Sequence, residues 1–278
     1  MLHSPMQNES QPVLVDPATG QPYSSPPVTP GTSAHEQPLA PVWHTVLIVA
    51  IMLGNSAFTA YFSSKVKHGT NTISGTERYI SYISSIFLEL FLLAMLWVGL
   101  RLRRTRIRDL IGGRWDSPES FLIDVAVAFG FWIGSYATLA GLSYLMGMAR
   151  ANQLEETKKL ASMLAPHSWG ALIVFILLSA TAGFVEELIF RGYLQRQIGI
   201  LTGRISVGVL ASALVFGAGH GYEGVRRMVL IFIFGLMFSA LTLWRRNLRS
   251  AMMAHAWFDA FQGVLLFVAT RTGFIPTH

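Results

Sequence analysis

The chain contains no cysteine and little charge. The missing thiols exclude disulfide bonds, thiolate metal sites and a cysteine nucleophile. Only 13% of the 278 residues are charged and 52% are hydrophobic, whereas soluble domains carry about 25% charged residues. A soluble protein of this length needs more polar surface to stay in solution, so the composition indicates an integral membrane protein.

Proline and basic residues divide the chain into two parts. Residues 1–41 hold nine of the twelve prolines, neither lysine nor arginine, and a single aromatic side chain, Tyr23. Such a segment buries too little apolar surface to offset its ordering entropy, so we expect a disordered, proline-rich tail over 1–41. The remainder, 42–278, is predicted to form one transmembrane helical domain.

Long apolar runs predict an all-α fold, a polytopic bundle of membrane-spanning helices. A spanning helix needs about 20 mostly apolar residues. Seven runs qualify, or eight if a further segment is broken or re-entrant, and they are 43–62, 80–100, 121–147, 169–190, 205–221, 228–244 and 250–269. The fifth run is short and rich in glycine, which leaves its ends open.

The basic residues lie between the apolar runs rather than in one patch, so the net charge of +6 does not indicate nucleic acid as a partner. Their densest group is five arginines within 101–108, directly after the second run. Because short cytoplasmic loops are enriched in lysine and arginine, this group predicts a cytoplasmic loop and a cytoplasmic N-terminus. We therefore expect a multi-pass protein of a bacterial plasma membrane, in contact with membrane lipid.

Several ionisable side chains fall inside the apolar runs, where each needs a partner or a function. They are Glu89, Glu186, Glu187, His220, His255 and Asp259. Glu187 and Arg191 are four residues apart, so they share a helix face and can form a buried ion pair. Glu186 points about 100° away from Glu187 and lacks such a partner, which suits a general base.

The two intramembrane histidines have different local settings. Glycines at positions 217, 219 and 221 flank His220, so that backbone or substrate can approach its imidazole closely. His255 and Asp259 are four residues apart and lie on one helix face, where they can bind each other or share a target. Each of these two histidine patterns can occur by chance, so they indicate a functional site only in combination with the glutamate pair.

Together, Glu186-Glu187-x-x-x-Arg191, Phe216-x-x-x-His220 and His255-x-x-x-Asp259 resemble the motifs of the CPBP family of intramembrane proteases. This family includes the CAAX prenyl endopeptidases and bacterial immunity-type proteins, and its three motifs lie on separate membrane helices in this order. The similar region covers about 165–270. The family more often has asparagine at the last position, so Asp259 departs from the pattern.

The resemblance implies an intramembrane endopeptidase that cleaves a membrane-associated or lipidated protein. The residues matched to its catalytic motifs are Glu186, Glu187, Arg191, His220, His255 and Asp259. In the family, the first glutamate and the histidine of the second motif activate the attacking water, and the third motif stabilises the oxyanion. A zinc enzyme is left open, because the two histidines and a carboxylate suffice for a metal site, so the cofactor is either none or one divalent metal.

Two other classes of function are compatible with these residues. One is a proton-coupled transporter, because intramembrane glutamates and histidines also form proton relays. The other is a non-catalytic immunity or scaffold member of the same fold.

The protease hypothesis also faces a geometric difficulty. In the predicted topology Glu186 lies toward the inner face and His220 toward the outer one, so the fifth run must be broken, tilted or re-entrant for them to meet.

Overall fold

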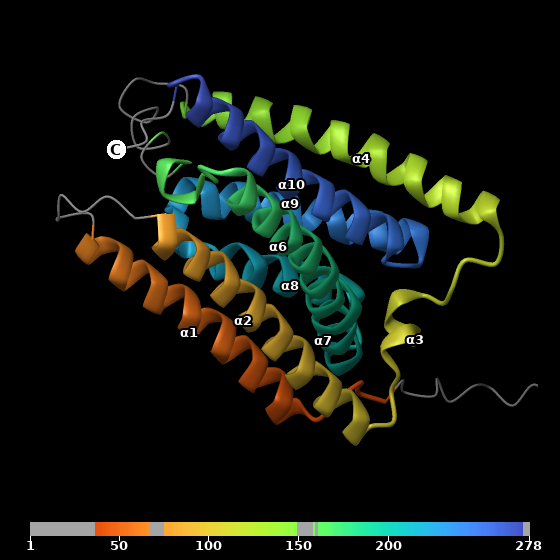
Figure 1. Ribbon diagram of the computed structural model, residues 1–278. Helices are drawn as coiled ribbons and strands as arrows, with labels where there is room; N and C mark the ends of the chain where they lie inside the picture. Colours follow the sequence, from red (N-terminus) through yellow and green to blue (C-terminus); the bar gives the residue numbers. More distant parts are fainter. Residues whose placement is uncertain (1–36, 67–74, 149–157, 159–160, 275–278) are drawn as a thin grey trace, which may run out of the picture. The chain divides into compact units, whose positions relative to one another are not determined.

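The computed structural model describes residues 37–66, 75–148, 158 and 161–274 (Figure 1). All regular secondary structure within these residues is helical, which confirms the all-α fold. The elements are α1 Val42–Val66, α2 Gly75–Leu102, α3 Ile107–Ile111, α4 Pro118–Leu145, α6 Trp169–Glu187, the π-helix η1 Leu188–Leu194, α7 Gln195–Thr202, α8 Ile205–Gly219, the 3₁₀ turn η2 Gly221–Glu223, α9 Val225–Arg245 and α10 Arg249–Arg271. Residues 1–36 of the predicted tail lie outside the described residues.

Six helices in the described part of the chain are long and apolar enough to cross a membrane. They are α1, α2, α4, the continuous helix Trp169–Thr202, α9 and α10. Only 11–44% of each spanning window is buried, so most of the apolar side chains face outward. An apolar exterior of this extent is stable in lipid and not in water, which makes the chain a multi-pass integral membrane protein. The remaining apolar run, the fifth, corresponds to α8, which is shorter.

The fourth apolar run does not end at residue 190 as its hydropathy suggests. Instead α6, η1 and α7 form one helix that continues to Thr202. Its middle part, η1, winds as a π-helix directly after Glu187. The hydroxyl of Ser212 in α8 donates to the Phe190 carbonyl oxygen at 2.7 Å, so this carbonyl has a hydrogen-bond partner from another helix. π-Helical turns are rare and concentrate at functional sites, so η1 marks this position as a candidate.

Helices α7 and α8 form a hairpin that turns at Gly203. This glycine ends α7 with φ 67°, a left-handed conformation that favours glycine. Glu186 lies 17 residues before it and His220 lies 17 residues after it. The 15 residues of α8 rise about 22 Å, less than the roughly 30 Å of a bilayer core. His220 therefore lies at a depth similar to that of Glu186, because α8 is short and the fourth run is long.

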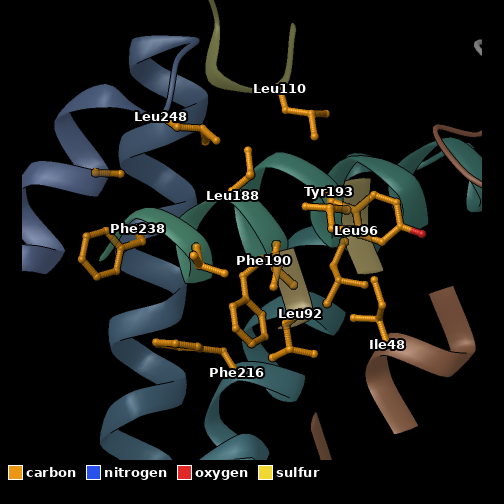
Figure 2. Packing of buried hydrophobic residues seen from close by; sticks show 14 of the residues in the cluster. Ile48, Leu92, Leu96, Leu110, Leu188, Phe190, Tyr193, Phe216, Phe238 and Leu248 are labelled. Carbon is orange, nitrogen blue, oxygen red and sulfur yellow. The ribbon is translucent and has the colours of Figure 1, made fainter. Parts of the chain in front are cut away.

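The hydrophobic core surrounds η1 (Figure 2). Leu188, Phe190, Tyr193 and Leu194 of η1 are each at most 2% exposed. Their partners in the core include Ile48, Leu92, Leu96, Phe216 and Phe238, which come from α1, α2, α8 and α9. Groups attached to η1 are therefore held in a closely packed setting from which water is largely absent.

Residues 37–41 are packed against the helical domain, although their sequence predicts that they belong to the tail. Leu39 and Ala40 are buried. The buried side chain of Gln197 in α7 binds their backbone: its Oε1 accepts from the Leu39 N–H at 2.7 Å, and its Nε2 donates to the Ala40 carbonyl at 2.7 Å. The packed part of the chain thus begins before the predicted boundary at 41. Gln197 makes this possible because its side chain forms hydrogen bonds with backbone groups that lie outside any helix.

Asp124 anchors α4, although its place near the end of an apolar run suggests contact with water. The carboxylate is fully buried and accepts from Arg245 Nη2 at 2.8 Å, Arg249 Nε at 2.7 Å, Ser250 Oγ at 3.0 Å and Trp115 Nε1 at 2.9 Å. These donors belong to α9, α10 and the segment before α4. The cluster therefore ties the least buried spanning helix to the bundle.

Helices α6 and α10 approach each other closely at Gly183. A Cβ at this position would lie 2.6 Å from the Ala256 backbone nitrogen and 2.9 Å from its Cα. We expect Gly183→Ala to force α10 away and to destabilise the protein by about 1–3 kcal/mol, the usual range for overpacking. The melting temperature in detergent, followed by circular dichroism, measures the effect. Gly134→Ala in α4 is the control, because a Cβ there meets nothing within 4 Å. Equal melting temperatures for the two variants would contradict the prediction.

Candidate active site

A cavity of about 890 Å³ lies among the helices of the described domain and is lined from α1, α2, α4, α6, α8, α9 and α10. Its acidic and imidazole-bearing lining residues are Glu89, Glu186, His220, Glu223, His255 and Asp259. Four of the six residues assigned from the sequence motifs are in this set. The other two, Glu187 and Arg191, are fully enclosed, and Glu187 contacts the cavity residue His255.

Glu187 and Arg191 form the ion pair predicted from their spacing. Arg191 Nη1 lies 2.8 Å from Glu187 Oε1, and the two side chains are 1% and 0% exposed. The Arg191 guanidinium also donates to the Gly235 carbonyl at 3.2 Å and lies 4.4 Å from the ring centre of Phe216. These contacts fix Glu187 in place and offset its charge.

His255 connects this ion pair to the cavity. Its Nδ1 lies 2.9 Å from Glu187 Oε1, and because an ionised carboxylate only accepts, Nδ1 carries the proton. Its Nε2 faces Glu186 Oε2 at 3.7 Å and Asp259 Oδ2 at 3.5 Å. The ring of Phe238 stacks on the imidazole at 5.1 Å. Glu187 and Phe238 therefore determine which nitrogen of His255 points toward the reacting groups.

Glu186 lacks the short hydrogen bonds from Arg191 and His255 that hold Glu187. Its side chain is 16% exposed, and its Oε2 is buried without a hydrogen-bond donor. Adjacent helix residues point about 100° apart, so Glu187 lies in the core and Glu186 at the cavity, as the spacing predicts. An unpaired carboxylate at a cavity wall is suited to accept a proton from water.

His220 caps α8 and is oriented by the first residue of its own motif. Its Nδ1 lies 2.9 Å from the Phe216 carbonyl oxygen, so Nδ1 donates and Nε2 is left to accept. The flanking glycines have different roles. A Cβ at Gly219 would meet nothing within 4 Å, whereas one at Gly217 would lie 2.8 Å from the Met228 carbonyl. Gly219 therefore leaves room beside the imidazole, and Gly217 serves the packing of α8 on α9.

The structure brings Glu186 and His220 to one cavity, because α8 is too short to cross the bilayer core and ends at His220. Their equal distance from Gly203 along the α7–α8 hairpin accounts for this. Asp259 is 34% exposed and lies one turn beyond His255 on α10, at the same cavity. The three sequence motifs, separated by about 30 residues each, thus meet at one place.

Sequence reasoning missed the polar groups that follow His220. Tyr222, Glu223 and Arg227 line the cavity, and Arg227 Nη1 lies 3.6 Å from Glu223 Oε2. Burial and the neighbouring Glu223 carboxylate raise the pKa of Tyr222 well above its usual range, so its hydroxyl remains protonated. The glycines on both sides of η2 mark a turn close to the histidine, and this signal could have pointed to them.

The side chains do not fit the zinc site considered from the sequence. Zinc takes three or four ligands at about 2.0–2.2 Å. Among the described residues no group of three or more His, Asp or Glu side chains is placed to hold a metal ion.

Comparison with known proteins gives one match. The family model described as type II CAAX prenyl endopeptidase Rce1-like matches residues 167–261. The matched segment contains all three motifs and extends from just before α6 into α10. Neither curated proteins nor solved structures gave a match to the chain. Residues 167–261, which carry the acidic and imidazole groups of the cavity other than Glu89, are therefore similar to the type II CAAX prenyl endopeptidase Rce1-like family.

Proposed function

We propose that the protein hydrolyses a peptide bond of a membrane-associated or lipidated protein, with water activated by Glu186 and His220. The observation that carries this proposal is the presence of the unpaired Glu186 and the oriented His220 at one cavity within the membrane helices. The match to the Rce1-like family supports the reaction type. The cavity volume of about 890 Å³ suits a segment of peptide or lipid chain.

The geometry suggests a sequence of proton transfers. Glu186 takes a proton from a water molecule that His220 Nε2 orients, and the water oxygen bonds to the scissile carbonyl carbon. The carbonyl oxygen then carries a negative charge. His255, protonated on both nitrogens, donates its Nε2–H to this oxygen while Glu187 holds its Nδ1–H. When the C–N bond breaks, Glu186 passes its proton to the leaving amine.

Asp259 supports His255 in this mechanism. Its Oδ2 lies 3.5 Å from His255 Nε2 on the side of the cavity. An ionised carboxylate cannot donate to an oxyanion, but it favours the charged imidazolium beside it. We therefore assign Asp259 the role of stabilising the protonated form of His255.

Orientation in the membrane can be tested on a chain that has no cysteine of its own. We propose that the N-terminus and the loop before α4 face the cytoplasm, because arginines are concentrated there. Asp116 in this loop and Thr272 after α10 are exposed and lie at opposite ends of the bundle. In intact cells, a membrane-impermeant thiol reagent should label Thr272→Cys, and it should label Asp116→Cys only after permeabilisation. The opposite pattern would reverse the orientation.

Substrate trapping tests the function itself. Membranes that contain the wild-type protein or the Glu186→Gln variant are compared by mass spectrometry of newly formed peptide termini and of peptides retained by the purified variant. We expect termini that depend on Glu186 and that come from membrane-associated proteins. Synthetic peptides of the recovered sequence, with and without a lipid group, then show whether lipidation is required. Identical termini in both membranes, together with proton flux in reconstituted vesicles, would favour a transporter instead.

A further inference from the structure

Glu89 lies at the same cavity as the predicted catalytic groups, on a helix outside the matched segment. It lies near the middle of α2, whereas the family match begins at residue 167. Its side chain lines the cavity, and its Oε2 is buried without a hydrogen-bond donor. An acidic side chain inside a membrane helix costs free energy, which suggests a functional role for Glu89. The family motifs do not include this residue.

Glu89 and Glu186 line the same cavity from α2 and α6, two helices that pack against each other. Their carboxyl groups interact electrostatically. Two ionised carboxylates are both acceptors, which leaves an oxygen of each without a donor, as observed for the Oε2 atoms of both residues. One proton between them would satisfy both groups and remove the repulsion of two adjacent negative charges.

The charges around the cavity require such a proton. The carboxyl groups present are those of Glu89, Glu186, Glu187, Glu223 and Asp259. Arginines pair with two of them, Glu187 at 2.8 Å and Glu223 at 3.6 Å. Three carboxyl groups remain, and the further cationic groups among the described lining residues are the imidazoles of His220 and His255. Even with both imidazoles charged, one carboxyl group has no positive partner, so we expect it to be neutral.

We propose that Glu89 is a positioning residue of the catalytic centre, which shares a proton with Glu186 and so holds one oxygen of Glu186 while the other faces the attacking water. The inference deepens the proposed peptidase function and depends on it for its kinetic consequence. The shared proton stays between the two carboxyl groups. The proton from water goes to the free oxygen of Glu186, so the two protons are distinct.

Infrared spectroscopy tests the shared proton without any assay of activity. A protonated carboxyl group absorbs at a different frequency from a carboxylate. The difference spectrum of wild type and Glu89→Gln at neutral pH should therefore show loss of a protonated carboxyl band. Glu119→Gln, at an exposed position in the first turn of α4, should show loss of a carboxylate band only. Loss of a carboxylate band in Glu89→Gln would overturn the shared proton, whether or not the protein is a peptidase.

Kinetics test the positioning role. Glutamine keeps the shape of Glu89 and donates a hydrogen bond to Glu186 in place of the shared proton, whereas leucine does not. We expect Glu89→Leu to lower kcat by about 10- to 100-fold, less than the loss of the general base itself, because Glu89 acts through Glu186. KM should change by less than about threefold, and Glu89→Gln should restore most of kcat.

A merely structural role gives a different pattern. It predicts a lower melting temperature for Glu89→Leu and a parallel loss of folded protein, with kcat per folded molecule unchanged. That pattern, or a Glu89→Gln variant as inactive as Glu89→Leu, would overturn the proposal. If the wild-type protein cleaves no peptide while the infrared result holds, the shared proton stands and the peptidase function fails.

Discussion

Replacing Glu186 by glutamine is expected to abolish peptide-bond cleavage and to leave the protein folded. Glutamine has the size of glutamate but cannot accept a proton from water, and loss of a positioned general base typically lowers kcat by about 10²–10⁴-fold. The fold should survive because Glu186 has no arginine partner, so the substitution leaves no buried cation unpaired. Turnover of the trapped substrate in reconstituted vesicles and melting temperature in detergent measure the two effects.

Glu119→Gln is the matched control for Glu186→Gln. The same chemical change at this exposed position of α4 should affect neither turnover nor melting temperature. If Glu186→Gln retained activity, another carboxylate at the cavity, Glu89 or Asp259, would have to act as the base. If it unfolded the protein, the separation of roles between Glu186 and Glu187 would be wrong.

Glu187→Ala is expected to have the opposite profile, with a large loss of stability. It leaves Arg191 buried at 1% exposure without its carboxylate, and it also removes the acceptor of His255 Nδ1. Breaking a buried ion pair by removing one partner typically costs about 3–5 kcal/mol. We therefore expect a low yield of folded protein and a clear drop in melting temperature in detergent.

Two variants determine whether burial of the pair causes this loss. Glu223→Ala removes a carboxylate whose partner, Arg227, is 27% exposed, so it should cost about 1 kcal/mol or less, as for surface pairs. The double variant Glu187→Ala with Arg191→Met removes both charges and should recover part of the lost stability. Equal melting temperatures for Glu187→Ala and Glu223→Ala would show that the core tolerates an unpaired Arg191.

The motif residues were predictable because their relations are local. Glu187 and Arg191, and likewise His255 and Asp259, are four residues apart on one helix, and the structure places each pair in contact at 2.8 Å and 3.5 Å. The turn between Glu186 and Glu187 follows from the 100° step of a helix. The predicted catalytic roles of these residues remain predictions.

Composition and hydropathy determined by themselves that the protein is an all-helical membrane protein, because both depend on residue type and order alone. The tertiary structure decided how deep each group lies and what it meets. The end of the fourth run depended on the packing that supports η1, including the hydrogen bond from Ser212 to Phe190. The burial of Asp124 depended on arginines more than a hundred residues away. The place of Glu89 beside Glu186 likewise depended on the packing of α2 against α6, since contacts between distant helices leave no periodic signal in a single sequence.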